Sequence, residues 1–217
     1  MITIVDYGLG NLGSIMNMFR RVGVPAECSR DPDRVASANK LLLPGVGAFD
    51  QGMKNIQNLG LKDALHQRVV HDQIPVMGIC LGMQLMGLRS EEGEEKGLEW
   101  INATSRRFSF EPDPDFRRPK IPHMGWAYVH KSSDHHIVDA FEEDTRFYFV
   151  HSFHMHCEES ENELLKAYYG RQFFTAGLTK GNILGFQFHP EKSHRFGMEL
   201  FKSFAKWEPV RHSGTNE

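Results

Sequence analysis

The chain has 217 residues, of which 40% are hydrophobic and 24% charged, and its formal net charge is −3. These values are typical of a globular domain that buries its own core, and the slight negative charge argues against a general affinity for nucleic acid or anionic membranes. Three cysteines without close paired spacing argue against a disulfide framework and predict a reducing compartment. With no signal-peptide pattern and no apolar run of about 20 residues, we expect a cytoplasmic protein.

The first third of the chain alternates apolar runs with helical patterns. Continuous apolar runs predict three buried strands, at residues 2–5, 41–43 and 76–80. Apolar residues at helical spacing predict helices over 12–22, where Gly23 ends the helix, and over 49–72, with a break near Gly60. Continuous apolar strands separated by helices indicate a parallel sheet that is covered on both faces.

The second half of the chain has a different pattern. Acidic, Gly-containing and Pro-rich compositions predict surface loops at residues 90–97 and 109–120. Further strand-like runs cover residues 127–130, 146–153, 164–169 and 183–189, and a last helix presents Phe196, Leu200, Phe201 and Phe204 on one face. We therefore predict one α/β domain over 1–207, with a largely parallel central sheet, helices on both faces and added antiparallel strands. Residues 208–217 are expected to form a frayed polar tail.

The segment from Gly78 to Gly82 is a candidate nucleophile site. An apolar strand ends at Cys80, a glycine lies two residues to either side, and a helical run follows. This spacing is typical of a strained strand-to-helix turn, in which glycines relieve crowding around a nucleophile at the start of a helix. The alternative, considered on this segment alone, is a small buried cysteine at the end of a strand.

A thiolate nucleophile needs a base and a group that orients the base, and the segment Phe186–Glu191 offers both. His189 and Glu191 are two residues apart, so an extended chain would place both side chains on one face. The alternative is an unremarkable surface pair at the end of a strand. A third candidate is the Pro44–Gly47 loop after a buried strand, which is able to direct backbone N–H groups into a crevice.

Taken together, these segments resemble the class I (triad) glutamine amidotransferases. The resemblance rests on GICLGMQ at 78–84, FHPE at 188–191 and PGVG at 44–47. VDYG at 5–8 with Gly10-Asn11, PHMGW at 122–126 and YFVHS at 148–152 narrow it to the glutaminase subunit of imidazole glycerol phosphate synthase, which acts in histidine biosynthesis. The resemblance extends from about Met1 to Trp207.

This resemblance implies an activity and roles for individual residues. The activity is hydrolysis of glutamine through a cysteine thioester, without cofactor or metal, with transfer of the ammonia to a cyclase-like synthase subunit. The implied roles are nucleophile for Cys80, general base for His189, orienting residue for Glu191, backbone oxyanion donors at Val46 and Leu81, glutamine binding for Gly45, Gln84, Ser152 and Phe153, and contacts with the synthase subunit for Asn11, Tyr148 and Lys192.

Two positions depart from the family pattern. Ala127 follows PHMGW where the family usually has Asn, and Phe153 stands where it usually has Tyr. Neither difference touches the triad, but both concern the identity of the ammonia acceptor. Related glutaminases supply ammonia for amidation of surface-polysaccharide sugars, and this function remains the alternative.

Two other segments suggest competing functions. Gly8–Gly13 matches G-x-G-x-x-G after a strand and before a helix, which is the pattern of a dinucleotide site. His151, His154, His156 and Cys157 suggest a metal site, but strand alternation puts His154 and His156 opposite the other two, so we predict no metal there. A catalytically inactive binding protein is the remaining alternative, and the intact triad argues against it.

Overall fold

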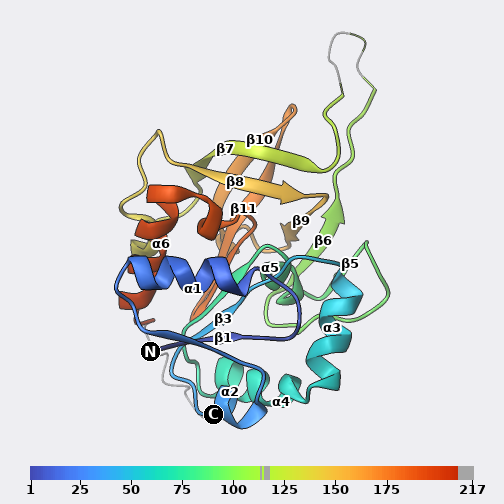
Figure 1. Ribbon diagram of the computed structural model, residues 1–217. Helices are drawn as coiled ribbons and strands as arrows, with labels where there is room; N and C mark the ends of the chain where they lie inside the picture. The colour runs from blue at the N-terminus through green and yellow to red at the C-terminus, as the bar shows by residue number, and fades with distance from the viewer. Residues whose placement is uncertain (113, 115–117, 210–217) are drawn as a thin grey trace, which may run out of the picture.

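The computed structural model describes residues 1–112, 114 and 118–209, in which strands and helices alternate through the first half (Figure 1). The strands are β1 (Ile2–Val5), β2 (Ala26–Ser29), β3 (Leu41–Leu43), β4 (Val76–Ile79), β5 (Arg89–Ser90), β6 (Ala103–Arg107), β7 (His123–Lys131), β8 (Arg146–His151), β9 (Phe153–Cys157), β10 (Glu163–Tyr169), β11 (Gln172–Lys180) and β12 (Ile183–Phe186). The α-helices are α1 (Leu12–Arg21), α2 (Pro32–Ala36), α3 (Phe49–Asn58), α4 (Leu61–His66), α5 (Leu81–Leu85) and α6 (His194–Lys206). The π-helix η1 (Gln67–His71) and the short 3₁₀ helices η2 (His136–Val138), η3 (Ser160–Asn162) and η4 (Pro190–Lys192) complete the elements.

The main sheet has the strand order β2-β1-β3-β4-β12-β11-β10-β7-β8. Its first five strands are parallel, and the strands from β11 onward pair antiparallel. A smaller extension follows from β11 through β9 and β6 to β5. The predicted α/β fold with added antiparallel strands is therefore confirmed.

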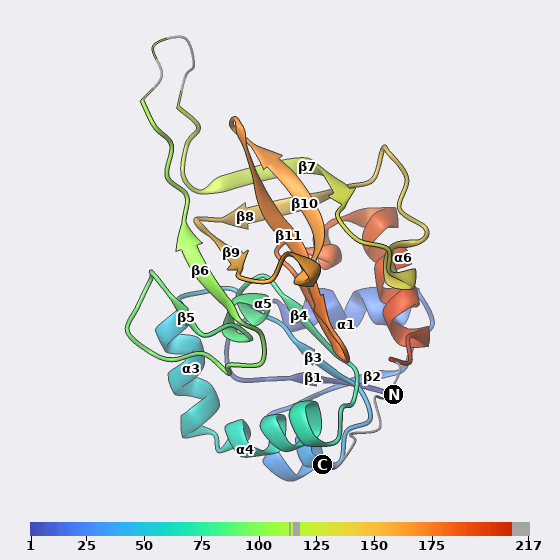
Figure 2. The same cartoon turned by 180° about the vertical axis from the view of Figure 1, so that it is seen from behind.

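Two hydrophobic cores cover opposite faces of the parallel strands. Alternation along β3 sends Leu42 into one core and its two neighbours into the other. Helices α1 and α6 pack on the first face, where Phe19 and Phe201 are in ring contact with centroids 4.6 Å apart. Helices α2, α3 and α4 cover the second face, and Figure 2 shows the two groups of helices on either side of the strands.

The structure corrects several predicted boundaries. The predicted strand 146–153 is two strands, because the chain turns at Ser152 and leaves β8 to pair with β6 and β11 as β9. The predicted strand 183–189 ends at Phe186, and the next residues leave the sheet. The predicted helix 49–72 is broken where expected, with Gly60 in the left-handed region at φ 67°. Strands β2, β5, β6 and β11, most of β9, and helix α2 were not predicted.

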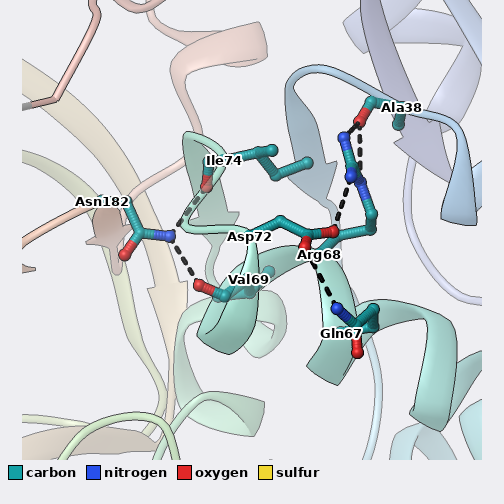
Figure 3. A network of polar contacts seen from close by, with 7 residues as sticks. All are labelled: Ala38, Gln67, Arg68, Val69, Asp72, Ile74 and Asn182. Carbon is teal, nitrogen blue, oxygen red and sulfur yellow. Dashed lines mark hydrogen bonds and ion pairs between the residues drawn. The ribbon is translucent and has the colours of Figure 1, made fainter. Parts of the chain in front are cut away.

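Polar contacts hold the amino-terminal end of β4 in place, on the opposite edge of the sheet from the strand ends described below (Figure 3). Arg68 of η1 donates to the Ala38 carbonyl from Nε at 3.0 Å, and its Nη1 lies 2.6 Å from an Asp72 oxygen. Asn182 donates at 2.8 Å to the carbonyls of the π-helix and of Ile74. The π-helical turn is thereby tied both to the residues before β3 and to the turn before β12.

Parts of two sequence predictions lie outside the described residues. Positions 113 and 115–117 of the predicted loop and positions 210–217 of the predicted tail are not described. The rest of the 109–120 loop and residues 208–209 contain no helix or strand. Within the described part of the chain, no helix is both long enough and apolar enough to span a membrane.

Candidate active site

The carboxyl ends of three neighbouring parallel strands bring the main candidate residues together. Strands β3, β4 and β12 are adjacent, with β4 in the middle. The Pro44–Gly47 loop follows β3, Cys80 follows β4, and His189 comes three residues after the end of β12. The edge formed by the carboxyl ends of parallel strands is where open α/β sheets bind ligands, so the topology explains why segments so far apart in sequence meet here.

Cys80 occupies the strand-to-helix turn that its flanking glycines predict. Its φ is 52°, a left-handed value that is unusual for a residue with a side chain and costs backbone energy. A Cβ on Gly82 would lie 2.0 Å from the Leu43 carbonyl oxygen, and one on Gly78 would lie 2.7 Å from the Gly82 carbonyl. Gly82 therefore lets α5 pack directly on the end of β3, and Gly78 lets α5 pack closely on β4. This packing holds the strained turn.

His189 and Glu191 form a buried pair beside this turn. Nδ1 of His189 lies 2.8 Å from Oε1 of Glu191, and both side chains are 1% exposed. The expected extended geometry is wrong, because Pro190 begins the short 3₁₀ helix η4 and the contact is made across that turn. The backbone is fixed on both sides, since the His189 N–H donates to the Tyr148 carbonyl and its own carbonyl accepts from Ser193 Oγ at 2.6 Å.

The surroundings of His189 favour its protonated form. Burial opposes the charge, but interactions with Cys80 and Glu191 outweigh it and raise the pKa of His189 to about 9. Its Nε2 atom is buried without a hydrogen-bond partner, although the Cys80 thiol is near enough to raise the proton affinity of the ring. This shift favours the imidazolium, which is the form able to protonate a leaving group.

The Pro44–Gly47 loop packs closely against the turn at Cys80. Tyr7 is fully buried, and its hydroxyl donates to the Pro44 carbonyl. A Cβ on Gly45 would lie 2.5 Å from Leu81 Cβ, so Gly45 is the residue that allows this approach. Gly47 has φ 137°, whereas Val46 is absent from the residues with positive φ and is 46% exposed. The loop therefore reaches the turn without a left-handed Val46.

A pocket of about 260 Å³ opens at this edge of the sheet. Six residues singled out from the sequence line it, namely Val46, Cys80, Leu81, Gln84, Ser152 and Phe153. Glu92, Pro122 and His151 also line it and were not predicted as site residues. Gly45 is not part of the lining, because it packs behind the pocket against Leu81. Larger cavities exist elsewhere, including one of about 740 Å³ at the amino-terminal edge of the sheet, but they do not contain these residues.

Comparisons with known proteins identify the family of the chain. The family model described as glutamine amidotransferase class-I matches residues 3–207. The chain belongs to this family. It is 48% identical over 206 residues to the imidazole glycerol phosphate synthase subunit HisH 2 of Pseudomonas aeruginosa, covering 95% of this chain and 99% of that protein. The protein of the same name from Methanococcus maripaludis gives the same identity and coverage. A solved glutamine amidotransferase crystal structure, 17% identical, matches 94% of this chain with a TM-score of 0.71 and supports the fold.

Gln84, expected to contact glutamine, belongs to a buried hydrogen-bond network in this amidotransferase. Its Nε2 donates to the Phe153 carbonyl at 3.2 Å and to Oε1 of Gln187 at 3.1 Å. Nε2 of Gln187 in turn lies 3.6 Å from the Cys80 sulfur. Gln187 was not predicted as a site residue. The signal for it in the sequence is a polar residue in an otherwise apolar run, two positions before His189.

The residues expected at a partner interface lie around the same edge of the sheet. Asn11 is exposed at the start of α1, and its side chain accepts from the Ser14 N–H at 3.2 Å. Tyr148 is half-buried on β8, and the Lys192 ammonium lies 5.7 Å from the centre of its ring. Tyr148 is also connected to the candidate triad, because its carbonyl accepts the His189 N–H.

The structure gives the glycine-rich segment another purpose than dinucleotide binding. A Cβ on Gly10 would lie 3.0 Å from Pro44 Cβ and 3.3 Å from the Gly45 nitrogen. The close approach that glycine permits here is therefore to the 44–47 loop of the chain itself. Gly13 lies within α1 with open space around its Cβ position, so it makes no tight helix–strand contact of the dinucleotide type.

Two buried histidines of the second half, His123 and His151, contact each other. His151 Nε2 lies 3.1 Å from His123 Nδ1, and its own Nδ1 lies 2.7 Å from the Phe153 carbonyl. His154 and His156 alternate with the buried Met155 and Cys157 along β9. Among the described residues, no group of three or more His, Cys, Asp or Glu side chains is arranged to hold a metal ion.

Proposed function

We propose that Cys80, His189 and Glu191 are the catalytic triad with which this amidotransferase hydrolyses glutamine to glutamate and ammonia, and that the ammonia passes to the cyclase subunit of an imidazole glycerol phosphate synthase. The observation that carries the proposal is that a strained cysteine lining the pocket interacts with the buried His189–Glu191 pair beside it. An imidazolium beside a thiolate is the ion pair that acyl transfer at a cysteine requires.

The reaction follows from these positions. The Cys80 thiolate attacks the side-chain amide carbon of glutamine. The resulting oxyanion accepts hydrogen bonds from the backbone N–H groups of Leu81 and Val46, and each such donor lowers the barrier by about 2.7–4 kcal/mol in comparable sites. His189 protonates the amide nitrogen from Nε2, the C–N bond breaks, and ammonia leaves a glutamyl thioester. The neutral ring then accepts a proton from water, which attacks the thioester and releases glutamate and the thiol. Glu191 keeps the ring oriented throughout.

The pocket lining supports glutamine as the substrate. Glu92 places a carboxylate in the lining, and this charge suits an α-ammonium group. That carboxylate is itself fixed, because its Oε2 accepts from the Phe49 N–H at 2.8 Å. Gln84 and the backbone around Ser152 and Phe153 supply further polar groups for the rest of the substrate.

An exposed aromatic surface on β7 supports a protein partner. Met124, Trp126 and Tyr128 are 62%, 45% and 49% exposed and lie on the outward face of β7. Pro122, the residue immediately before this strand, lines the pocket. We call these three residues the β7 surface. Trp126 stacks on His194 with the ring planes 3° apart, so it is held in place. Exposed, ordered aromatic residues are typical anchors of protein interfaces, and Asn11, Tyr148 and Lys192 would extend the contact.

The pathway assignment rests on the relatives. Two proteins at 48% identity, which this chain matches almost end to end, are named as imidazole glycerol phosphate synthase subunits. Transfer to a bound partner also suits the chemistry, since ammonia released into water is protonated and lost to the acceptor. The alternative acceptor, a sugar, would require a different synthase on the same surface.

The test uses the complex of this chain with the synthase subunit from the same organism. Cys80→Ala should abolish product formation driven by glutamine and leave product formation driven by ammonium salts intact. Cys157→Ala is the matched control, because burial raises the pKa of that thiol to about 12 and makes it a poor nucleophile. Glutamine-driven synthesis by the Cys80 variant would overturn the triad, and failure to bind the cyclase would overturn the pathway assignment alone.

A further inference from the structure

Gln187 connects the wall of the pocket to the nucleophile. It is fully buried and follows β12, where its backbone N–H donates to the Ala176 carbonyl at 2.9 Å. Its side-chain amide lies between Gln84 and Cys80 and contacts both. A buried amide whose two ends touch a pocket residue and the nucleophile is placed to act on the sulfur.

The direction of these hydrogen bonds is fixed by one atom, the Phe153 carbonyl oxygen, which can only accept. The Gln84 amide nitrogen must therefore face it, at 3.2 Å. The same nitrogen lies 3.1 Å from the Gln187 amide, so Gln187 must present its oxygen there and its NH₂ group to the sulfur. Reversing either amide would set two acceptors or two donors against each other in a buried site.

The far end of this chain of contacts is anchored by two buried histidines. His151 must donate from Nδ1 to the Phe153 carbonyl at 2.7 Å, so its Nε2 accepts from His123 Nδ1 at 3.1 Å. Desolvation by burial keeps both rings neutral, and it lowers the pKa of His123 to about 4. The Phe153 carbonyl thereby accepts hydrogen bonds from both His151 and Gln84, which holds in place the acceptor that orients the two glutamine amides.

We propose that Gln187 is a positioning residue whose amide N–H holds the Cys80 sulfur and stabilises it as a thiolate. A hydrogen bond from an amide to an anionic sulfur favours the charged form, and the burial of both groups strengthens it. His189, in the turn after β12, and Tyr7, after the end of β1, also interact electrostatically with Cys80. The proposal rests on the proposed function of Cys80, and it assigns to Gln187 a part of thiol activation that the triad does not supply.

The experiment compares Gln187→Met, which keeps the length of the side chain and removes the amide, with the unchanged protein. Gln57→Met, on the exposed face of α3, is the matched control. The rate at which iodoacetamide modifies Cys80 is followed by mass spectrometry from pH 5 to pH 10, and kcat and KM for glutamate release are measured in the synthase complex. Thermal unfolding of each variant reports folding.

We expect the alkylation profile of Gln187→Met to shift to higher pH, with roughly ten- to a hundredfold slower modification at pH 7, the range expected for a lost hydrogen bond to a charged group. The value of kcat should fall more than KM rises, and the Gln57 variant should behave like the unchanged protein. An unshifted alkylation profile in a folded Gln187→Met variant would overturn the proposal. If that variant does not fold, Gln84→Met removes the partner that orients Gln187, and an unshifted profile there has the same meaning.

This outcome is separable from that of the proposed function. Alkylation reports the sulfur whether or not the chain hydrolyses glutamine, whereas the Cys80→Ala test reports only turnover. A shifted profile together with an active Cys80→Ala complex would leave Gln187 acting on a sulfur that is not the nucleophile.

Discussion

Replacing Gly82 by alanine should separate the parts of the active site. The new Cβ would lie 2.0 Å from the Leu43 carbonyl oxygen, and ordinary contact begins near 3.4 Å, so α5 and the end of β3 must move apart by about 1.4 Å, the difference between the two distances. The obstruction is backbone, which cannot rotate away as a flexible side chain does. Cys80 and Leu81 are carried on the displaced helix turn, while Val46 stays with the loop.

The expected magnitude has two parts. Overpacking of a close-packed site costs about 1–3 kcal/mol, and contact with backbone puts this variant near the upper end. For a chain of this length, that cost lowers the Tm by roughly 6–12 °C. A displacement of about 1 Å among reacting groups costs on the order of a hundredfold in rate, so glutamate release in the synthase complex should fall at least that much.

The assay measures glutamate release, alkylation of Cys80 and thermal unfolding side by side. Gly13→Ala is the matched control, because Gly13 lies inside α1 with nothing within 4 Å of its Cβ position. There the same substitution should stabilise the protein by about 0.5–1 kcal/mol through helix propensity and leave glutamate release unchanged. Glutamate release within twofold of the unchanged protein by Gly82→Ala, with an unchanged Tm, would refute the claim that α5 must contact the end of β3.

Three further predictions concern the triad, the histidine pair and the loop. His189→Ala should lower kcat by several orders of magnitude, and Glu191→Gln by less, because the carboxylate orients the ring but transfers no proton; the reverse order in steady-state assays would contradict these roles. Folding lowers the pKa of His123 from 6.5 to about 4, so the unfolded chain binds more protons than the folded one between these pH values. The free energy of unfolding therefore falls as the pH drops through that window, by about 2 kcal/mol at pH 5. Urea unfolding at pH 7 and pH 5, compared with the same measurement on His123→Gln, tests this loss. The isolated chain should be a poor glutaminase that its partner activates, because the β-branched Val46 disfavours the left-handed backbone that glycine adopts freely in this loop. Val46→Gly should therefore raise the basal rate of glutamate release. Equal rates for the chain alone, with its partner, and with partner plus acceptor would exclude this regulation.

The elements that could be predicted from sequence are those whose burial on both faces gives them a continuous run of apolar residues. Strands β1, β3 and β4 are continuous apolar runs because both faces are covered, and they were found. Strand β2, with the sequence AECS, has only intermediate or exposed residues, and it is a strand because it pairs with β1 at the edge of the sheet. Strand β6, ATSRR, likewise depends on its pairing with β9. Such strand pairing is part of the tertiary structure, and the composition of the strand itself does not predict it.

The same distinction applies to the site. The spacing of Gly78, Cys80 and Gly82 is local, so the turn could be predicted from sequence. The His123–His151 contact joins residues 28 positions apart, and the role of Glu92 depends on a loop folding back over α3 to cap it. A single polar residue such as Gln187 has many possible partners, and only the fold selects the two that it contacts.

Strand β8 links the β7 surface with the catalytic residues. On one side it pairs with β7 in register, with Tyr148 opposite Trp126. On the other side, the Tyr148 carbonyl accepts a hydrogen bond from the His189 N–H, and the Tyr148 N–H donates to Ser193 Oγ at 3.0 Å. A partner that contacts Trp126 would therefore act on the strand that fixes the backbone of His189. Because the sheet is close-packed, small displacements of β8 are not absorbed locally. If the partner docks on the β7 surface as proposed, its binding acts directly on the position of His189, because β7 and β8 are neighbours in one sheet.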